Sequence, residues 1–232
     1  MKCICIPVRE RFTLLVQLIE SLEPFQRKGW TIVLGIEPGC ELMNRVYGKR
    51  NPVYTLFNTS TYGIGWNHYR VLVHAFNQLQ AEIAMVIDAD TKLLPDAVNL
   101  MEWFYPRRNE YLGLSMLSPK LEDSYPHRDE ALIECSFASR FQLTLSREIW
   151  YKYVQPVWMR KGYWDEDYSD VIRRTGLKVV HPEKSRLRLY GQTNSRVLNV
   201  EEHERIEERL VCFEGDSVRG YYMKDPVIVE RR

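Results

Sequence analysis

Two carboxylates one residue apart, Asp88 and Asp90, are the strongest candidates for chemistry in this sequence. They follow directly after an apolar run at residues 84–87, which is typical of a buried strand. Open α/β sheets bind ligands just outside the carboxyl ends of their strands. Two carboxylates there can hold a divalent cation against a diphosphate, because hard cations take oxygen ligands. The structural alternative is a solvated turn, since Asp is common in turns.

The first half of the chain alternates strand-like and helical patterns. The spacing predicts strands at residues 2–7, 31–36, 53–57 and 82–87. It predicts helices at residues 12–22, 41–47 and 66–79, and another that Pro95 opens as a first-turn proline. Such alternation implies a parallel sheet covered on both faces, with the acidic pair at its carboxyl edge.

The second half is less regular. Strands are expected at residues 112–117, 132–135, 178–181 and 187–190. Helices are expected at 165–174, at 200–211 and directly after Ser146, which would be the N-cap of its helix. The sequence contains no internal repeat and no linker rich in Pro, Gly or Ser. We therefore expect one domain over 1–232. Its expected parts are a nucleotide-binding half (1–90), an acceptor and catalytic half (91–198), and a C-terminal helix and tail (199–232).

Composition limits the class of protein. The 232 residues are 45% hydrophobic and 27% charged, which argues against a largely disordered chain. A net charge of +1 supplies no overall basic field for nucleic acid. The sequence has neither an apolar run of the ~20 residues that a membrane span needs nor a signal-peptide pattern, so we expect a cytoplasmic protein. Five cysteines without paired metal spacing indicate small buried residues in a reduced compartment.

Ordered motifs around the acidic pair resemble the nucleotide-sugar glycosyltransferases of the GT-A fold. The likeness is closest to glycosyltransferase family 13, the N-acetylglucosaminyltransferase I type, and the family 2 pattern is also visible. It implies an α/β fold with a single GT-A (Rossmann-like) domain, in which helices flank a mostly parallel sheet beside a smaller mixed acceptor-side region. The motifs that carry it are Asn58-x-x-x-x-Gly63-x-x-Trp66-Asn67-His68-Tyr69-Arg70, Asp88-Ala89-Asp90, the stretch 162–168 and the stretch 173–182.

The resemblance assigns four residues to the nucleotide. Pro7 ends the first strand, and Arg9 or Arg11 stands where the family places a basic residue near the nucleotide. An exposed arginine at a helix start is the structural alternative. Glu37 stands where the family has an acidic residue that accepts the uracil N–H, although the usual residue is Asp.

Four further residues belong to the diphosphate side. Arg70 is placed near the diphosphate or the acidic loop, and an ion pair to Asp88 is its alternative. Asp88, Ala89 and Asp90 match the acidic triplet of the family, in which Asp88 belongs to the donor-binding residues and Asp90 takes the place of the metal ligand. Ala89 departs from family 13, where an acid usually contacts the ribose, but family 2 members often carry a neutral residue there. The departure therefore bears on donor-sugar preference and not on metal binding.

Asp165 follows Trp164 and matches the general base of the family. It also stands at a predicted helix N-terminus, so a plain N-cap is the structural alternative, compatible with a base. Ser195 is placed near a phosphate, with a polar loop residue as its alternative. His181 is a possible third metal ligand, but a lone His at a strand end is more often structural.

The resemblance implies an inverting, metal-dependent hexosyltransferase that moves a GlcNAc- or Glc-type sugar from a UDP-sugar to a hydroxyl. Mn²⁺ or Mg²⁺, held through Asp90, would neutralise charge on the departing UDP. Asp165 would take the proton of the acceptor hydroxyl. A single displacement of this kind inverts the anomeric centre.

The sequence is compatible with several kinds of acceptor. Candidates are a glycan, a lipid-linked precursor, a protein or a hydroxymethylated base in viral DNA. Basic and aromatic residues at 104–108 and 158–164 are of the types that hold phosphate and stack a base, and Arg107, Arg108, Arg160 and Lys161 are the candidate phosphate contacts. Two other classes are a non-catalytic carbohydrate-binding module and a sugar-phosphate nucleotidyltransferase. The latter usually carries a Gly-rich N-terminal loop, which residues 6–11 lack.

Overall fold

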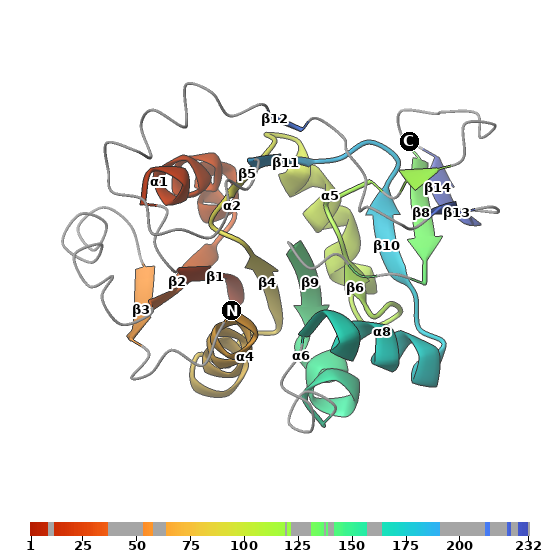
Figure 1. Cartoon of the computed structure of the whole chain (residues 1–232), viewed down its shortest axis with the longest axis horizontal. Coiled ribbons are helices and arrows are strands. Elements are labelled where there is room, and N and C mark those ends of the chain that lie inside the picture. The colour runs from red at the N-terminus through yellow and green to blue at the C-terminus, as the bar shows by residue number, and fades with distance from the viewer. Residues whose placement is uncertain are drawn as a thin grey trace.

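A nine-stranded mixed sheet lies at the centre of the computed structural model, and helices cover both of its faces (Figure 1). The strand order is β14-β8-β10-β6-β9-β4-β1-β2-β3. The structure describes residues 1–8, 12–36, 53–57, 64–118, 120–121, 131–136, 138, 142–156, 164–190, 212–213, 222–223 and 227–231.

Parallel strands form one side of this sheet. The central β1 pairs in parallel with β2 and β4, and β2 pairs in parallel with β3. β1, β2 and β4 consist almost entirely of buried apolar residues, as strands covered on both faces require. All four strands were predicted to within one residue. Their bounds are β1 (Lys2–Val8), β2 (Trp30–Ile36), β3 (Val53–Phe57) and β4 (Ile83–Ile87).

The other side of the sheet is mixed. β9 is antiparallel to both of its neighbours, β4 and β6, and β8 is antiparallel to β10. β9 and β8 therefore run opposite to the other strands of this sheet. The expected fold class, a mostly parallel α/β sheet with a mixed region, is confirmed, although no strand was predicted for β9. The bounds here are β6 (Gly113–Leu114), β8 (Ala131–Cys135), β9 (Gln142–Ser146) and β10 (Val179–Pro182).

Two apolar clusters hold the helices against the two faces. The first contains residues of α1 (Phe12–Ser21), α2 (Glu23–Arg27) and α5 (Ala97–Phe104). The second contains residues of α4 (Ile64–Val73), the short α6 (Arg147–Ile149) and α8 (Trp164–Thr175). Figure 1 shows α1 and α2 on one side of the sheet and α4, α6 and α8 on the other. Each face of β1 therefore contributes to a separate core.

Two of the cysteines are buried in the second cluster. Cys3 and Cys5 are two residues apart on β1, so both side chains face the side of the sheet that α4 covers. Burial raises the pKa of the Cys3 thiol to about 11 and raises that of Cys5 as well. These thiols are uncharged at neutral pH and pack as small apolar residues, as the sequence indicates.

Several helix boundaries differ from the predictions. α5 begins at Ala97, so Pro95 lies in the turn before that helix and not in its first turn. The helix expected at 66–79 ends as an α-helix at Val73 and continues as the π-helix η1 (His74–Gln78). The Ser146 cap is confirmed, because its Oγ accepts a hydrogen bond from Ile149 N at 3.2 Å. The helices expected at 41–47 and 200–211 fall outside the described residues.

Short strands build two further sheets and extend the central one; of these, β11 was predicted at residues 187–190 and is confirmed, whereas the others were not predicted. β5, β11 and β12 form an antiparallel sheet of three strands, and β13 pairs with β7. β14 pairs with β8 at the edge of the central sheet, so described C-terminal residues take part in all three sheets. The bounds are β5 (Thr91–Leu93), β7 (Lys120–Leu121), β11 (Leu187–Tyr190), β12 (Cys212–Phe213), β13 (Tyr222–Met223) and β14 (Val227–Arg231).

Within the described part of the chain, every helix is too short or too polar to cross a membrane.

Candidate active site

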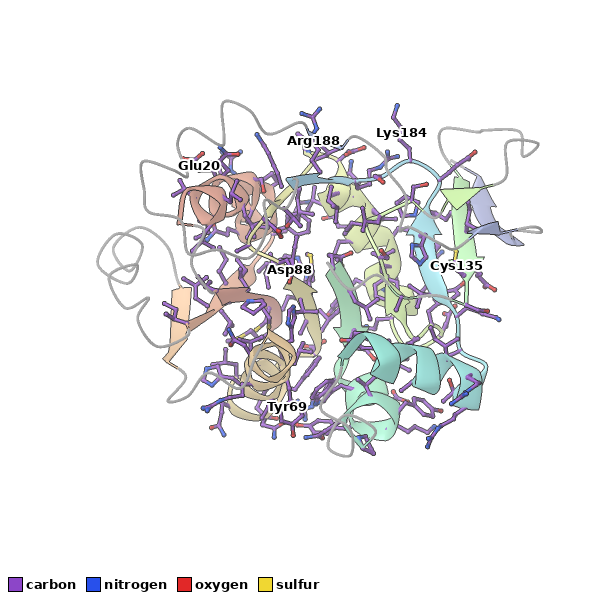
Figure 2. The ribbon with its side chains drawn as sticks, viewed as in Figure 1. Glu20, Tyr69, Asp88, Cys135, Lys184 and Arg188 are labelled. Carbon is purple, nitrogen blue, oxygen red and sulfur yellow. The ribbon has the colours of Figure 1, made fainter. Side chains whose placement is uncertain are left out.

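The acidic pair occupies a turn between β4 and β5, which we call the acidic turn (residues 88–90). β4 is entirely buried and ends at Ile87, so Asp88 stands at the carboxyl end of a parallel strand. Thr91 Oγ1 donates to the Asp88 carbonyl oxygen at 2.7 Å and holds the turn closed. Figure 2 shows Asp88 near the centre of the view, whereas Glu20 and Lys184 lie at the outline of the molecule. The acidic turn thus lies at the sheet edge where α/β folds bind ligands.

Asp88 is oriented by a histidine of α4. His68 Nε2 lies 2.9 Å from Asp88 Oδ1, and the His68 side chain is fully buried while that of Asp88 is 14% exposed. An ionised carboxylate only accepts hydrogen bonds, so Nε2 carries the proton. The sequence also allows an ion pair between Arg70 and Asp88. The partner is His68, because residues two apart on a helix do not share a face, and Arg70 is half-buried elsewhere on α4.

A glycine in β2 allows α4 to lie close enough for this pairing. A Cβ at Gly35 would clash with Val71 Cγ1 and stand 2.6 Å from Asn67 Oδ1. Asn67 Nδ2 also donates to the Gly35 carbonyl oxygen at 2.9 Å. The neighbour of His68 is thereby tied to β2, and α4 is fixed over the carboxyl end of the sheet.

The three residues of the acidic turn have different surroundings. Asp88 faces α4 through its bond to His68. Ala89 belongs to the apolar cluster on the α1 and α5 side, together with Leu93 and Leu187. Asp90 is only 4% exposed. A carboxylate held at so little exposure is expensive unless it is compensated, which is typical of functional sites.

The residues present fit a cation that is shared with a ligand. Among the described residues, no group of three or more His, Cys, Asp or Glu side chains could hold a metal ion. The acidic turn offers at most two carboxylates, as in sites where Mg²⁺ or Mn²⁺ is bound by one or two carboxylates, water and substrate phosphates. His181 Nδ1 lies 2.8 Å from the Leu117 carbonyl oxygen, so this nitrogen donates a proton and is not a ligand.

The helix with the expected base begins as predicted. α8 starts at Trp164, which puts Asp165 in its first turn, and the side chain of Asp165 lies outside what the structure describes. Tyr168 is fully buried in the cluster on the α4 side, and α8 contacts α4. Gly176 ends the helix with φ +70° and donates its N–H to the Ile172 carbonyl oxygen at 2.9 Å. The predicted stop at Thr175-Gly176 is confirmed.

Other expected residues lie in different places. Pro7 is buried in β1, one residue before the end of that strand. Arg107 and Arg108 do not join the acidic turn, because they follow α5 at the other end of β4, where Arg108 Nη2 lies 3.6 Å from Glu82 Oε2. The remaining ones fall outside the described residues: Arg9, Arg11, Glu37, Arg160, Lys161 and Ser195.

Sequence reasoning missed a group of buried polar side chains beside the acidic turn. Gln142 and Thr144 of β9 are fully buried, and so is Ser115 after β6. The signal was available in the run Gln142–Ser146, where polar residues alternate with Leu143 and Leu145 at the period of a strand. Burial of the polar face was not foreseen, because such faces usually meet solvent.

Comparison with solved structures decides the fold class. The chain matches S. aureus TarS 1–349 in complex with UDP-GlcNAc with a TM-score of 0.58 and 11% identity, over 88% of this chain and 64% of that one. It matches the mannosyltransferase PcManGT of Pyrobaculum calidifontis, in complex with GDP-Man and Mn²⁺, with a TM-score of 0.54 and 15% identity, over 78% of this chain and 54% of that one.

The chain has the GT-A fold. It spans less than two thirds of the length of both solved chains. No protein-family model matches the sequence, and no curated protein matches it. At such low identity the likeness concerns the fold.

Proposed function

We propose that this chain is an inverting, metal-dependent glycosyltransferase that moves a GlcNAc- or Glc-type sugar from a UDP-sugar to a hydroxyl acceptor, and that it is related to family 13. One observation carries the proposal. In a GT-A fold, a buried Asp90 follows Asp88 at the carboxyl end of β4, and His68 holds Asp88 in one orientation. The proposed division is a donor half at 1–90, an acceptor half at 91–198 and a tail at 199–232.

On the donor side, Asp90 is proposed to hold Mn²⁺ or Mg²⁺ against the diphosphate. The bound ion would neutralise negative charge on the departing UDP. His68 keeps Asp88 turned toward α4, because its Nε2 lies within hydrogen-bond distance of that carboxylate. A GT-A neighbour solved with GDP-Man and Mn²⁺ supports this use of the acidic turn.

Nucleotide recognition is assigned to residues at the ends of the parallel strands. Pro7 lies near the end of β1, either Arg9 or Arg11 follows that strand, and Glu37 follows directly after β2. A Glu37 carboxylate accepts the N–H of uracil, which adenine does not offer at that position. A neighbour solved with UDP-GlcNAc supports a uridine donor. Arg70 and Ser195 are proposed phosphate contacts.

On the acceptor side, Asp165 is the proposed general base. In the first turn of α8 its carboxylate is favoured in the ionised form by the helix dipole and the unpaired N–H groups. It takes the proton as the acceptor oxygen attacks the anomeric carbon opposite the UDP. The C–O bond to UDP breaks as the new C–O bond forms, so one displacement inverts the configuration.

The acceptor is proposed to be a hydroxyl of a glycan, a lipid-linked precursor or a protein. A flipped DNA base gains no support from Arg107 and Arg108, because these residues lie at the end of β4 opposite the acidic turn. Arg107 instead stacks on Trp103, with its guanidinium carbon 4.7 Å from the ring centroid.

The test compares two neighbouring carboxylates of α8. Asp165→Asn should lower turnover of UDP-GlcNAc and UDP-Glc in the presence of Mn²⁺ by about a thousandfold, because the base is lost while the shape is kept. Asp167→Asn is the matched control and should retain turnover. Both variants should bind UDP with Mn²⁺ as the parent does, measured as a thermal shift. Unchanged turnover of Asp165→Asn, or a larger loss in Asp167→Asn, would overturn the assignment.

A further inference from the structure

Buried polar side chains gather where β6 and β10 end and β9 begins. Gln142, His181 and Ser185 are all less than a tenth exposed. Buried polar groups in native proteins are almost always hydrogen-bonded, so such a group forms a network or costs stability. Here the partners are the backbone groups of one short stretch, residues 115–118, which we call the braced segment.

Side chains hold the backbone of the braced segment. Met116 N donates to Gln142 Oε1 at 2.5 Å, and Ser118 N donates to Ser185 Oγ at 2.9 Å. The Leu117 carbonyl oxygen accepts from His181 Nδ1 at 2.8 Å. β6 ends after two residues, and these side chains satisfy backbone groups that a longer strand would have paired in a ladder.

Gln142 connects the braced segment to β4. Its Nε2 donates to Thr144 Oγ1 at 3.1 Å and reaches the Leu114 carbonyl oxygen at 3.4 Å, which fixes the direction of the amide. In the sheet register, Gln142 is the partner of Ile87, the residue directly before the acidic turn. The amide therefore lies between the carboxyl end of β4 and the segment after β6.

A second set of bonds continues from the braced segment to the far side of the acidic turn. Arg186 N donates to the Met116 carbonyl oxygen at 2.7 Å, and the Arg186 carbonyl oxygen accepts from Leu94 N at 2.9 Å. Arg186 Nε also lies 3.0 Å from Asp96 Oδ2. Leu94 follows β5, the strand that begins directly after Asp90.

The same network reaches the helix with the proposed base. β10 follows α8 after a three-residue connection, and the network side chains His181 and Ser185 lie in and just after β10. Ser115 N also donates to the Val180 carbonyl oxygen at 2.9 Å. The braced segment is therefore bonded on one side to the unit formed by β4, the acidic turn and β5, and on the other to the unit formed by α8 and β10.

We propose that Gln142 is a positioning residue that, through the braced segment, fixes the acidic turn relative to the α8–β10 unit. The proposal rests on the proposed function, in which Asp90 and Asp165 act on opposite sides of one anomeric carbon. A single displacement needs both groups at a set separation, and a misplacement of about 1 Å can cost about a hundredfold in rate. The bond from Met116 N to Gln142 Oε1 is a step that one side chain controls, and it joins the braced segment to β9, the strand that pairs with β4.

The test replaces Gln142 by an apolar side chain of similar length. In Gln142→Met, the amides of Met116 and Ser118 should exchange hydrogen at least about tenfold faster, because the brace is opened locally. Turnover of UDP-GlcNAc, with water or glycerol as acceptor, should fall about tenfold or more in kcat. The KM for UDP-GlcNAc and the Kd for UDP with Mn²⁺ should stay within about twofold, because the donor half is untouched.

Two further variants make the test specific. Gln78→Met places the same substitution on the exposed part of η1 and should change neither exchange nor kcat. Thr144→Val removes only the hydroxyl that receives Gln142 Nε2, so its effect on kcat should have the same sign and be smaller.

The proposal is overturned if exchange accelerates while kcat per folded molecule is unchanged, since Gln142 is then purely structural. It is also overturned if UDP affinity falls together with kcat, because the network would then serve the donor half. Failure of the proposed function looks different: the parent protein itself would neither bind UDP with Mn²⁺ nor turn over the UDP-sugar.

Discussion

The two ends of β4 carry similar acidic residues in opposite environments. Glu82 stands before the strand with half of its side chain exposed, and Tyr105, Arg108 and the N-terminal amine surround it. Asp88 stands after the strand, is 14% exposed and faces a fully buried His68. The charges at the first end compensate one another and are screened by solvent, so they contribute little to the stability of the fold. At the second end, a carboxylate is oriented within the fold beside a buried Asp90.

The difference teaches that the position of an acid along the strand, and not its type, marks the site. Parallel strands bring their carboxyl ends together, so loops from distant parts of the sequence meet at that edge. At the amino end of β4, Tyr105, the residue directly after α5, contacts both the acid and one of its cations. Arg108 lies over the Tyr105 ring at 4.5 Å, and the Tyr105 hydroxyl donates to Glu82 at 2.7 Å.

The largest expected effect is at Asp90. Asp90→Ala should lower turnover of UDP-GlcNAc with Mn²⁺ by about a thousandfold, or about 4 kcal/mol, because the proposed metal ligand is lost. Glu82→Ala, at the other end of β4, should retain turnover within about twofold. Steady-state kinetics with a titration of Mn²⁺ measures both variants. Equal losses in the two variants would remove the distinction between the ends.

His68 should produce the next largest effect. His68→Phe keeps a ring in the buried site but removes the Nε2 proton that Asp88 accepts, so turnover or Mn²⁺ affinity should fall about 10- to 100-fold. Tyr105→Phe removes the corresponding donor from Glu82 and should leave both unchanged. The comparison fails if the phenylalanine at position 68 is tolerated as well as the one at position 105.

A third prediction concerns glycines at the two ends of β2. Gly35→Ala should lower the free energy of unfolding by about 2 kcal/mol and also reduce turnover, because α4 must move away from the sheet. Gly29 precedes β2 with φ +80° and open space around it, so Gly29→Ala should cost about 1 kcal/mol by backbone strain and leave turnover intact. Urea unfolding and kinetics on the same samples separate the two. Loss of turnover in Gly29→Ala would contradict the role given to α4.

The smallest effect is the pH dependence contributed by Glu82. The Tyr105 hydroxyl, the N-terminal amine and Arg108 lower the pKa of Glu82 in the folded protein. A lowered pKa means that its stabilisation is complete above the ordinary Glu pKa of about 4.3 and is lost as the pH falls through the folded-state pKa. Glu82→Gln should therefore lower the free energy of unfolding by less than about 1 kcal/mol at pH 7.

The difference between the parent and Glu82→Gln should shrink as the pH falls below the ordinary Glu pKa, as measured by urea unfolding at a series of acidic pH values. A difference that grows toward low pH would show that the sign is wrong.

Local pattern was enough to predict the half of the fold that carries the acidic turn. Buried parallel strands are continuous apolar runs, so β1, β2 and β4 stand out without knowledge of their partners. The acidic turn needed only the rule that such strands present ligands at their carboxyl ends. Helix α8 and its end at Gly176 were likewise predictable, because helix termination depends on neighbouring residues.

Local sequence patterns did not predict which side chains contact one another in the candidate site. Asp88 is paired with His68, twenty positions away in sequence, because Gly35 admits α4 close to β2 and turns His68, not Arg70, toward the strand end. β9 is inserted antiparallel between β4 and β6, so the polar face of Gln142 and Thr144 is buried and not solvated. Burial periodicity is encoded within a few residues, whereas the choice of neighbour depends on the packing of elements that are far apart in the chain. Tertiary packing therefore supplied the orientation of Asp88 and the brace beside the acidic turn.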